Sequence, residues 1–77
     1  MSIEQEVKDA IENAMEGAIA TVNGGGGHFV IDVISDQFAG KRLLEKQRLV
    51  YSAIAHLMAG DAAPVHAVDQ MTCRLPE

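Results

Sequence analysis

F-A-G-K-R-L-L-E-K-Q-R-L-V-Y at residues 38–51 and P-V-H-A-V at residues 64–68 are the segments that decide the fold of this chain. After Gly40, apolar residues recur every three or four positions, which is typical of an amphipathic helix. Gly60 ends this pattern, and the chain then extends through Pro64. We therefore predict a helix over residues 41–58 and a strand over residues 65–73. The predicted buried stripe of the helix consists of Leu43, Leu44, Gln47, Val50, Tyr51, Ile54, Leu57 and Met58.

The residues before this helix predict a further helix and two strands. Ser2 and Gln5 fit a capping box, and an apolar stripe with helical spacing continues to about Glu16. Strands are predicted at residues 18–23 and 28–34, because the second segment alternates between two faces.

The four consecutive glycines Gly24–Gly27 join these two strands. A phosphate-binding loop would require Lys-Ser or Lys-Thr at the start of a helix, whereas a strand follows here. We therefore interpret the glycines as a flexible connection within an antiparallel hairpin. After the second strand, Ser35 or Asp36 is able to cap a short helical turn.

The predicted elements follow the order α, β, β, α, β in a chain of 77 residues, which is the length of one domain. This order predicts an α+β fold with the helices on one face of a three-stranded sheet. Cys73 is the only cysteine, and the chain has neither a signal-peptide-like N-terminus nor about 18 consecutive apolar residues. We therefore expect a single domain over residues 1–77 that is cytoplasmic and not membrane-bound.

The chain resembles the BolA family, small αβ proteins that bind monothiol glutaredoxins, at Gly40, Arg48, Val50, Tyr51 and His66. Lys46 and Gln47 make it most similar to the branch that has Lys-Gln where other members have Arg-His. The resemblance extends over nearly the whole chain. It implies an αββαβ arrangement like that of class II KH domains, with a helix-turn-helix element before the third strand.

His66 is the first candidate metal ligand. Its place after Pro64, at the start of a strand, allows one ring nitrogen to face solvent, although most histidines in such positions bind no ligand. The resemblance implies more. His66 matches the family histidine that ligates a two-iron, two-sulfur cluster shared with a glutaredoxin and glutathione.

His28 is the second candidate. Family members commonly have Cys or His in the hairpin loop, but this chain has Gly25 where some members have Cys. His28 lies nearby, directly before Phe29. Two interpretations stay open, a second cluster ligand and a histidine at a strand edge.

Four of the six basic residues are Lys41, Arg42, Lys46 and Arg48, although the net charge of the chain is −5. An acidic domain is not expected to rely on phosphate contacts for its affinity. Three interpretations of the cluster stay open. The first is a solvated helix face, and the second is a helix that contacts a nucleic-acid groove. The third is a docking surface for a glutaredoxin or for the carboxylates of glutathione.

Catalysis has little support in the sequence. No nucleophile has a recognisable triad, and no pair of carboxylates stands out, so we do not expect an enzyme. His56 is expected to be exposed on the second helix. Cys73 is expected to act as a small apolar residue at the far end of the third strand from His66.

These observations and the resemblance imply an adaptor that binds a monothiol glutaredoxin. It would complete a bridging two-iron, two-sulfur cluster with His66, and with His28 in one alternative, in iron–sulfur trafficking or in regulation by iron or stress. The protein alone is expected to hold no cofactor. A nucleic-acid-binding transcriptional regulator is the alternative, and an interaction module without metal is the third interpretation. Weak DNA binding and a homodimer are left open.

Overall fold

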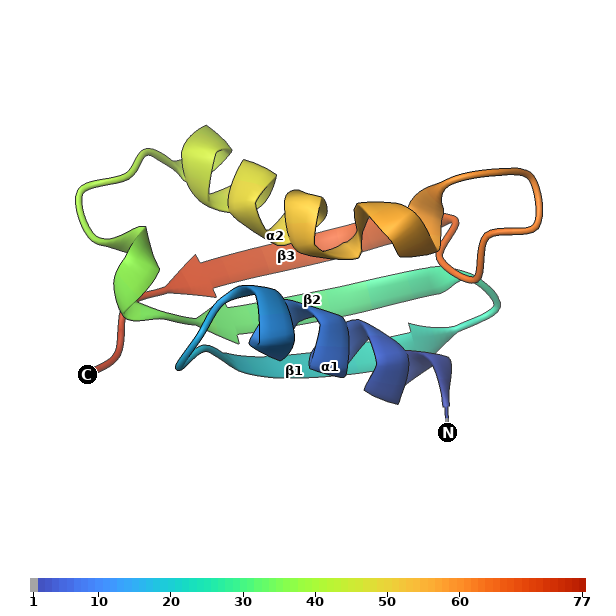
Figure 1. The fold of residues 1–77 in the computed structure, drawn as a ribbon, viewed down its shortest axis with the longest axis horizontal. Coiled ribbons are helices and arrows are strands. Elements are labelled where there is room, and N and C mark those ends of the chain that lie inside the picture. Colours follow the sequence, from blue (N-terminus) through green and yellow to red (C-terminus); the bar gives the residue numbers. More distant parts are fainter. Residues whose placement is uncertain (1) are drawn as a thin grey trace.

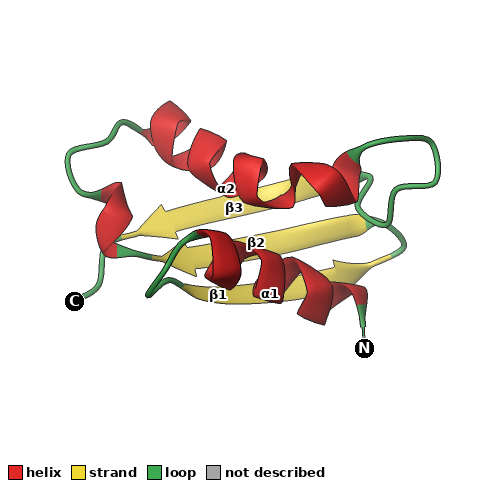
Figure 2. Ribbon diagram, in the orientation of Figure 1, coloured by secondary structure: helices red, strands yellow, loops and turns green. Residues whose placement is uncertain are grey.

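The computed structural model describes residues 2–77. The elements are α1 (Ile3–Ala14), β1 (Ile19–Gly25), β2 (His28–Ile34), the 3₁₀ turn η1 (Asp36–Phe38), α2 (Leu43–Met58) and β3 (Ala67–Arg74). The strands form one sheet in the order β1-β2-β3, in which β1 and β2 are antiparallel and β2 and β3 are parallel. Both helices cover the same face of this sheet (Figures 1 and 2). The predicted α+β fold is therefore confirmed.

Helix α1 begins as the sequence predicts. The backbone N–H of Gln5 donates a hydrogen bond of 3.1 Å to the Oγ of Ser2, which satisfies one of the free donors at a helix N-terminus. Val7 and Ile11 are fully buried beneath the helix. The helix ends at Ala14 rather than near Glu16, because Met15 leaves the helical conformation and Gly17 has a φ of 82°.

The glycine run is divided between the end of β1 and a two-residue turn. Gly24 and Gly25 belong to β1 and pair with Phe29 and His28 in the antiparallel register. Only Gly26 and Gly27 remain in the turn, with φ values of 62° and 85°. A two-residue type I′ turn requires positive φ at both of its central residues, which glycine adopts without strain. The predicted antiparallel hairpin is confirmed, and its connection is shorter than the four glycines suggest.

The core lies between the helices and the sheet. Phe29, Ile31 and Val33 alternate on the helix-facing side of β2 and are at most 2% exposed. The remaining buried apolar residues are Val7, Ile11, Met15, Ala18, Ala20, Phe38, Val50, Ala53, Ile54, Ala63 and Val65. No helix within residues 2–77 has the length and apolarity needed to cross a bilayer.

The predicted buried stripe of α2 is wrong at its N-terminal end. Leu43 and Leu44 are 62% and 57% exposed, and Tyr51 is 37% exposed, whereas Val50 and Ile54 are fully buried. Tyr51 follows Val50 by one residue and therefore points about 100° away from it around the helix axis. The first turn of α2, which holds both leucines, rises away from the sheet (Figure 1). The predicted start at residue 41 was also two residues early.

The connection through α2 decides where β3 begins. Because β3 is parallel to β2, its first residue, Ala67, pairs with His28, the first residue of β2. The segment that precedes β3 therefore reaches the same end of the sheet as the hairpin turn.

Candidate functional site

His66 is fastened by its backbone to the hairpin turn. The N–H groups of His66 and Ala67 both donate to the carbonyl oxygen of Gly27, at 2.8 and 3.0 Å. On the other side, the N–H of Val65 donates to the carbonyl oxygen of Leu57 in the last turn of α2, at 3.1 Å. His66 is thus held between the end of α2 and the turn.

The imidazole of His66 lies directly over Gly27. A Cβ atom placed on Gly27 would stand only 2.1 Å from Cδ2 and 2.9 Å from Cγ of His66, which is far inside van der Waals contact. Glycine is therefore needed at position 27 for two reasons, the positive φ and the ring above it.

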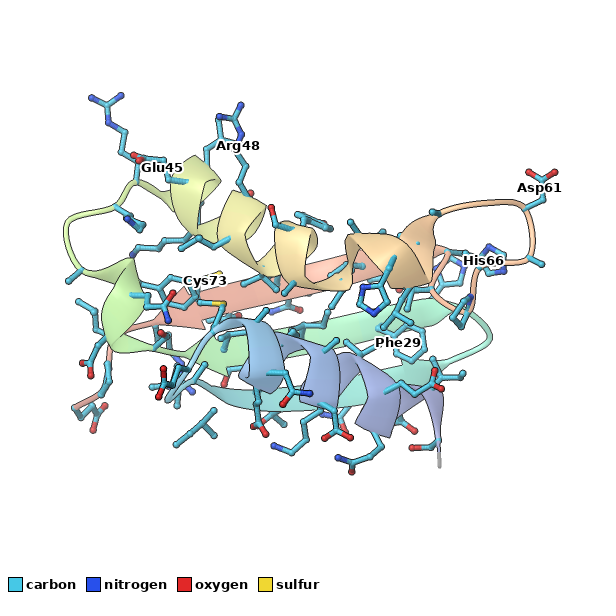
Figure 3. All side chains as sticks on the ribbon, in the orientation of Figure 1. Phe29, Glu45, Arg48, Asp61, His66 and Cys73 are labelled. Atoms are coloured by element: carbon cyan, nitrogen blue, oxygen red, sulfur yellow. The ribbon has the colours of Figure 1, made fainter. Side chains whose placement is uncertain are left out.

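The ring of His66 is presented to solvent. The residue is exposed, and it lies at the edge of the molecule beside the loop between α2 and β3 (Figure 3). The side-chain hydrogen bonds found within residues 2–77 do not involve its ring nitrogens. A neutral imidazole with a fixed backbone and a solvent-facing ring can act as a metal ligand.

His28 lies at the same end of the sheet but in a different environment. Phe29 beside it points into the core, so alternation along β2 directs His28 to the face away from the helices. Its Nδ1 lies 3.2 Å from Oδ1 of Asp69, and its side chain is 60% exposed. No group of three or more His, Cys, Asp or Glu side chains in the described part of the chain is arranged to hold a metal ion. The two candidate ligands therefore reach the same end of the molecule, with the side chain of His28 on the face of the sheet away from the helices.

Cys73 lies far along β3 from His66 and His56 is exposed, as the sequence predicts. Cys73 pairs with Val33 near the opposite end of β3 and packs against the core. Burial raises the pKa of its thiol, which disfavours the thiolate form that would bind a metal. His56 is exposed on α2.

The basic cluster lies at the N-terminal end of α2, opposite His66 (Figure 3). Lys8 and Arg74 form ion pairs with Glu12 and Asp32, so their charges are locally balanced. Within residues 2–77, the ion pairs do not include the four clustered cations, namely Lys41, Arg42, Lys46 and Arg48.

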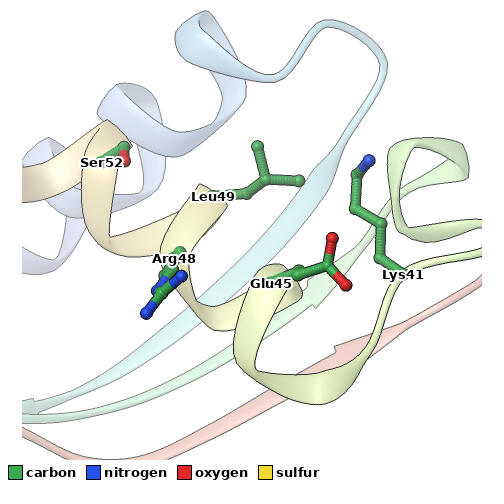
Figure 4. Close-up of a pocket in the computed structure, with 5 residues that line it drawn as sticks. All are labelled: Lys41, Glu45, Arg48, Leu49 and Ser52. Carbon is green, nitrogen blue, oxygen red and sulfur yellow. The ribbon is translucent and has the colours of Figure 1, made fainter.

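A shallow hollow of about 240 Å³ opens beside this cluster. It is lined by Lys41, Glu45, Arg48, Leu49 and Ser52 (Figure 4). Glu45 contributes its Oε1 as acceptor for the N–H of Arg42, at 3.3 Å, rather than pairing with a basic side chain.

The sequence analysis missed one feature near each end of α2. The exposure of Leu43 and Leu44 could not be predicted, because their spacing in the sequence is the same as that of buried residues on α2. The contact of Gly27 with His66 joins residues that are distant in sequence, and only the parallel pairing of β2 with β3 brings them together.

Comparison with known proteins places the chain in a family. The sequence profile described as "BolA-like protein" matches residues 2–77. Protein BOLA2 of Arabidopsis thaliana is 35% identical over 60 residues, which cover 77% of this chain. The chain spans 52–60% of the length of the curated relatives that it matches.

Solved structures agree with this assignment. The crystal structure of a bol-like protein from Babesia bovis has a TM-score of 0.74 and 35% identity, with 99% of this chain and 87% of that chain covered. BolA1 from Arabidopsis thaliana shares the fold with a TM-score of 0.80 over 99% of this chain and 94% of that chain, at 18% identity. Fold, sequence profile and relatives all lead to one conclusion: the chain belongs to the BolA-like protein family.

Proposed function

We propose that this protein is an adaptor that binds a monothiol glutaredoxin and contributes His66 to a two-iron, two-sulfur cluster shared between the two proteins. The observation that carries the proposal is the position of His66, whose ring is exposed while its backbone is bonded to Gly27. Family membership supports it, because the histidine at this position matches the ligand that the BolA resemblance implies.

The donor set fits a shared cluster. Iron–sulfur clusters of this kind need four protein or cofactor ligands, usually thiolates, with histidine replacing some of them in certain centres. His66 offers one imidazole, and the thiol of Cys73 is half-buried near the other end of β3. One exposed ligand is suited to completing a cluster whose remaining ligands come from a partner, here the glutaredoxin cysteine and glutathione.

The chain's own contribution is to fix the ligand in place. When bound, the cluster supplies electron transfer or transferable iron and sulfur, and histidine ligation raises its reduction potential relative to thiolate ligation. Gly27 holds the backbone of His66, and the end of α2 holds that of Val65. Little conformational entropy then remains to be lost at this residue on binding, which favours association.

His28 is a proposed second ligand under one alternative only. It would have to give up the contact between its Nδ1 and Asp69 and turn around the end of β2 to approach a metal bound by His66. The competing alternative is that His28 stays with Asp69 and that His66 is the only ligand from this chain.

The test is co-expression with a monothiol glutaredoxin, followed by visible absorbance, circular dichroism and the rate of cluster release. His66→Ala should keep the fold but change the spectrum and speed the release. His56→Ala is the matched control, because it removes an exposed histidine of α2 whose side chain takes part in none of the side-chain hydrogen bonds found within residues 2–77. A His66→Ala complex with the wild-type spectrum and release rate would exclude ligation by His66.

The same measurement decides the role of His28. If His28 is a ligand, His28→Ala should change the spectrum as His66→Ala does, and the double variant should add little, since two ligands of one metal act as a unit. If His28 stays with Asp69, His28→Ala should behave like the wild-type protein.

A further inference from the structure

The N-terminal end of α2 carries a surface that the proposed function does not use. It combines cations with exposed apolar side chains, and we call it the basic–apolar surface. Its members are Lys41, Arg42, Leu43, Leu44, Lys46 and Arg48.

This surface is unbalanced in both charge and polarity. Four cations and one carboxylate, Glu45, lie within eight residues of a chain with a net charge of −5. Within residues 2–77, carboxylates form ion pairs with Lys8 and Arg74 but with none of these four cations. Among the exposed large apolar residues within residues 2–77, Leu43 has the highest exposed fraction and Leu44 the third highest. Adjacent exposed leucines are unfavourable in water unless something covers them.

The surface is also far from His66. Helix α2 has 16 residues, so about 24 Å separates its two ends. His66 lies next to the C-terminal end, because Val65 bonds to Leu57. A protein bound at the turn and His66 can therefore leave the basic–apolar surface free.

We propose that the basic–apolar surface binds a second protein partner through an acidic segment that carries apolar side chains. Charge complementarity selects an acidic occupant, because the ion pairs within the described residues include none of the four cations. Glu45, the one carboxylate among them, accepts the backbone N–H of Arg42. The leucines select a protein over a nucleic acid, since phosphates and base edges make little use of two aliphatic side chains. The shallow hollow between Lys41 and Arg48 offers a place for one side chain of the partner. The protein would then join two partners, one at each end of α2.

The test uses the isotopically labelled full chain and two synthetic peptides. The first is a short helix-forming peptide with leucine on one face and glutamate on the other, and the second has glutamine in place of every glutamate. The acidic peptide should shift the backbone amide resonances of residues 41–52 and leave those of Gly27 and His66 in place. The glutamine peptide should bind more weakly.

Two variants separate the charge from the apolar contribution. Arg48→Gln should weaken binding up to about fivefold, as expected for an exposed ion pair. Leu44→Ser should weaken it by about tenfold, as expected for loss of one buried aliphatic side chain. Asn13→Glu on α1 is the control, since it lowers the net charge by one, as Arg48→Gln does, at an exposed position on the other helix. It should change little.

The proposal fails if the acidic peptide shifts no amide of residues 41–52 at millimolar concentration, or if Leu44→Ser binds it as the wild-type protein does. Tighter binding of a DNA duplex, unchanged by Leu44→Ser, would overturn it in favour of a nucleic-acid surface. Concentration-dependent shifts of the same amides without any peptide would assign the surface to self-association instead. His66→Ala should bind the peptide normally, so failure of the glutaredoxin hypothesis would not affect this result.

Discussion

The two ends of α2 present side chains in opposite ways. At the C-terminal end, backbone hydrogen bonds to Gly27 and Leu57 fix the segment that carries His66, and only one ring is offered to solvent. At the N-terminal end, long cationic side chains and two leucines extend from a helix turn with few contacts to the sheet. A fixed backbone suits the strict geometry that a metal demands of its ligands, whereas long exposed side chains suit a protein surface that adapts on contact.

The largest loss of stability should come from truncating a buried apolar side chain that packs α2, which separates the two regions, against the core. Ile54 of α2 is fully buried, and Ile54→Ala should lower the free energy of unfolding by about 2–5 kcal/mol through loss of burial and a residual cavity. That is a large part of the total stability expected for a domain of this size. Urea unfolding followed by circular dichroism measures the loss.

Ile19→Ala is the matched control, because Ile19 is 59% exposed on β1. Its effect should stay within about 0.5 kcal/mol, as for most surface substitutions. Equal losses for the two variants would mean that α2 is not held by its central contacts with the core.

A smaller and more local effect is expected at the hairpin turn. Gly27→Ala should destabilise the fold by about 1–3 kcal/mol, because it imposes a positive φ on a residue with a side chain. It should also push the imidazole away from the turn, since the new Cβ would overlap Cδ2 of His66. The ring resonances of His66, measured by NMR, report this displacement.

Gly26→Ala separates the two causes. Gly26 also has a positive φ, but nothing lies within 4 Å of an added Cβ. It should cost stability and leave the ring of His66 unmoved. An unmoved ring in Gly27→Ala as well would show that Gly27 does not position His66.

The smallest loss of stability is expected at Glu12 on α1, away from both ends of α2. Glu12 accepts hydrogen bonds from the N–H of Ala20 and from Lys8, and these hold the pKa of Glu12 below its ordinary value of 4.5. A carboxylate with a lowered pKa stabilises the fold above its ordinary pKa, and this contribution is lost as the pH falls through the folded-state value. Glu12→Gln should therefore lower stability by about 1 kcal/mol at neutral pH and flatten its decline below pH 4.5.

Urea midpoints measured from neutral pH to pH 3 test this expectation. Glu16→Gln is the control, because Glu16 is exposed and its side chain takes part in none of the hydrogen bonds found within residues 2–77. A pH dependence that is identical in wild type and Glu12→Gln would contradict the assignment.

The fold was predictable because its main signals are periodic. Alternation at Phe29, Ile31 and Val33 identified β2, and helical spacing identified α1 and α2, with errors of a few residues at the ends. The segments after Gly17 and Pro64 were then predicted as the remaining strands. The exposed leucines were not predictable from spacing, because spacing does not say how far a helix extends beyond its sheet. Leu43 and Leu44 continue the helical pattern past the last contacts with the core.

The candidate site was predictable only in part. The resemblance identified His66 as a proposed ligand, and its exposure agrees with that role without testing it. The support from Gly27 could not be predicted, because it depends on the register between β2 and β3. The Gly-rich run gave a signal, but the signal indicated flexibility rather than a tight turn beneath a histidine.

The parallel pairing of β2 with β3 also has a consequence for how the protein folds. The hairpin of β1 and β2 can form from neighbouring residues, whereas β3 must wait until η1, α2 and the following loop have closed a long connection. His66 meets Gly27 only when that last strand docks. A chain in which β3 has not yet paired with β2 therefore lacks the two hydrogen bonds that hold His66 and Ala67 at Gly27.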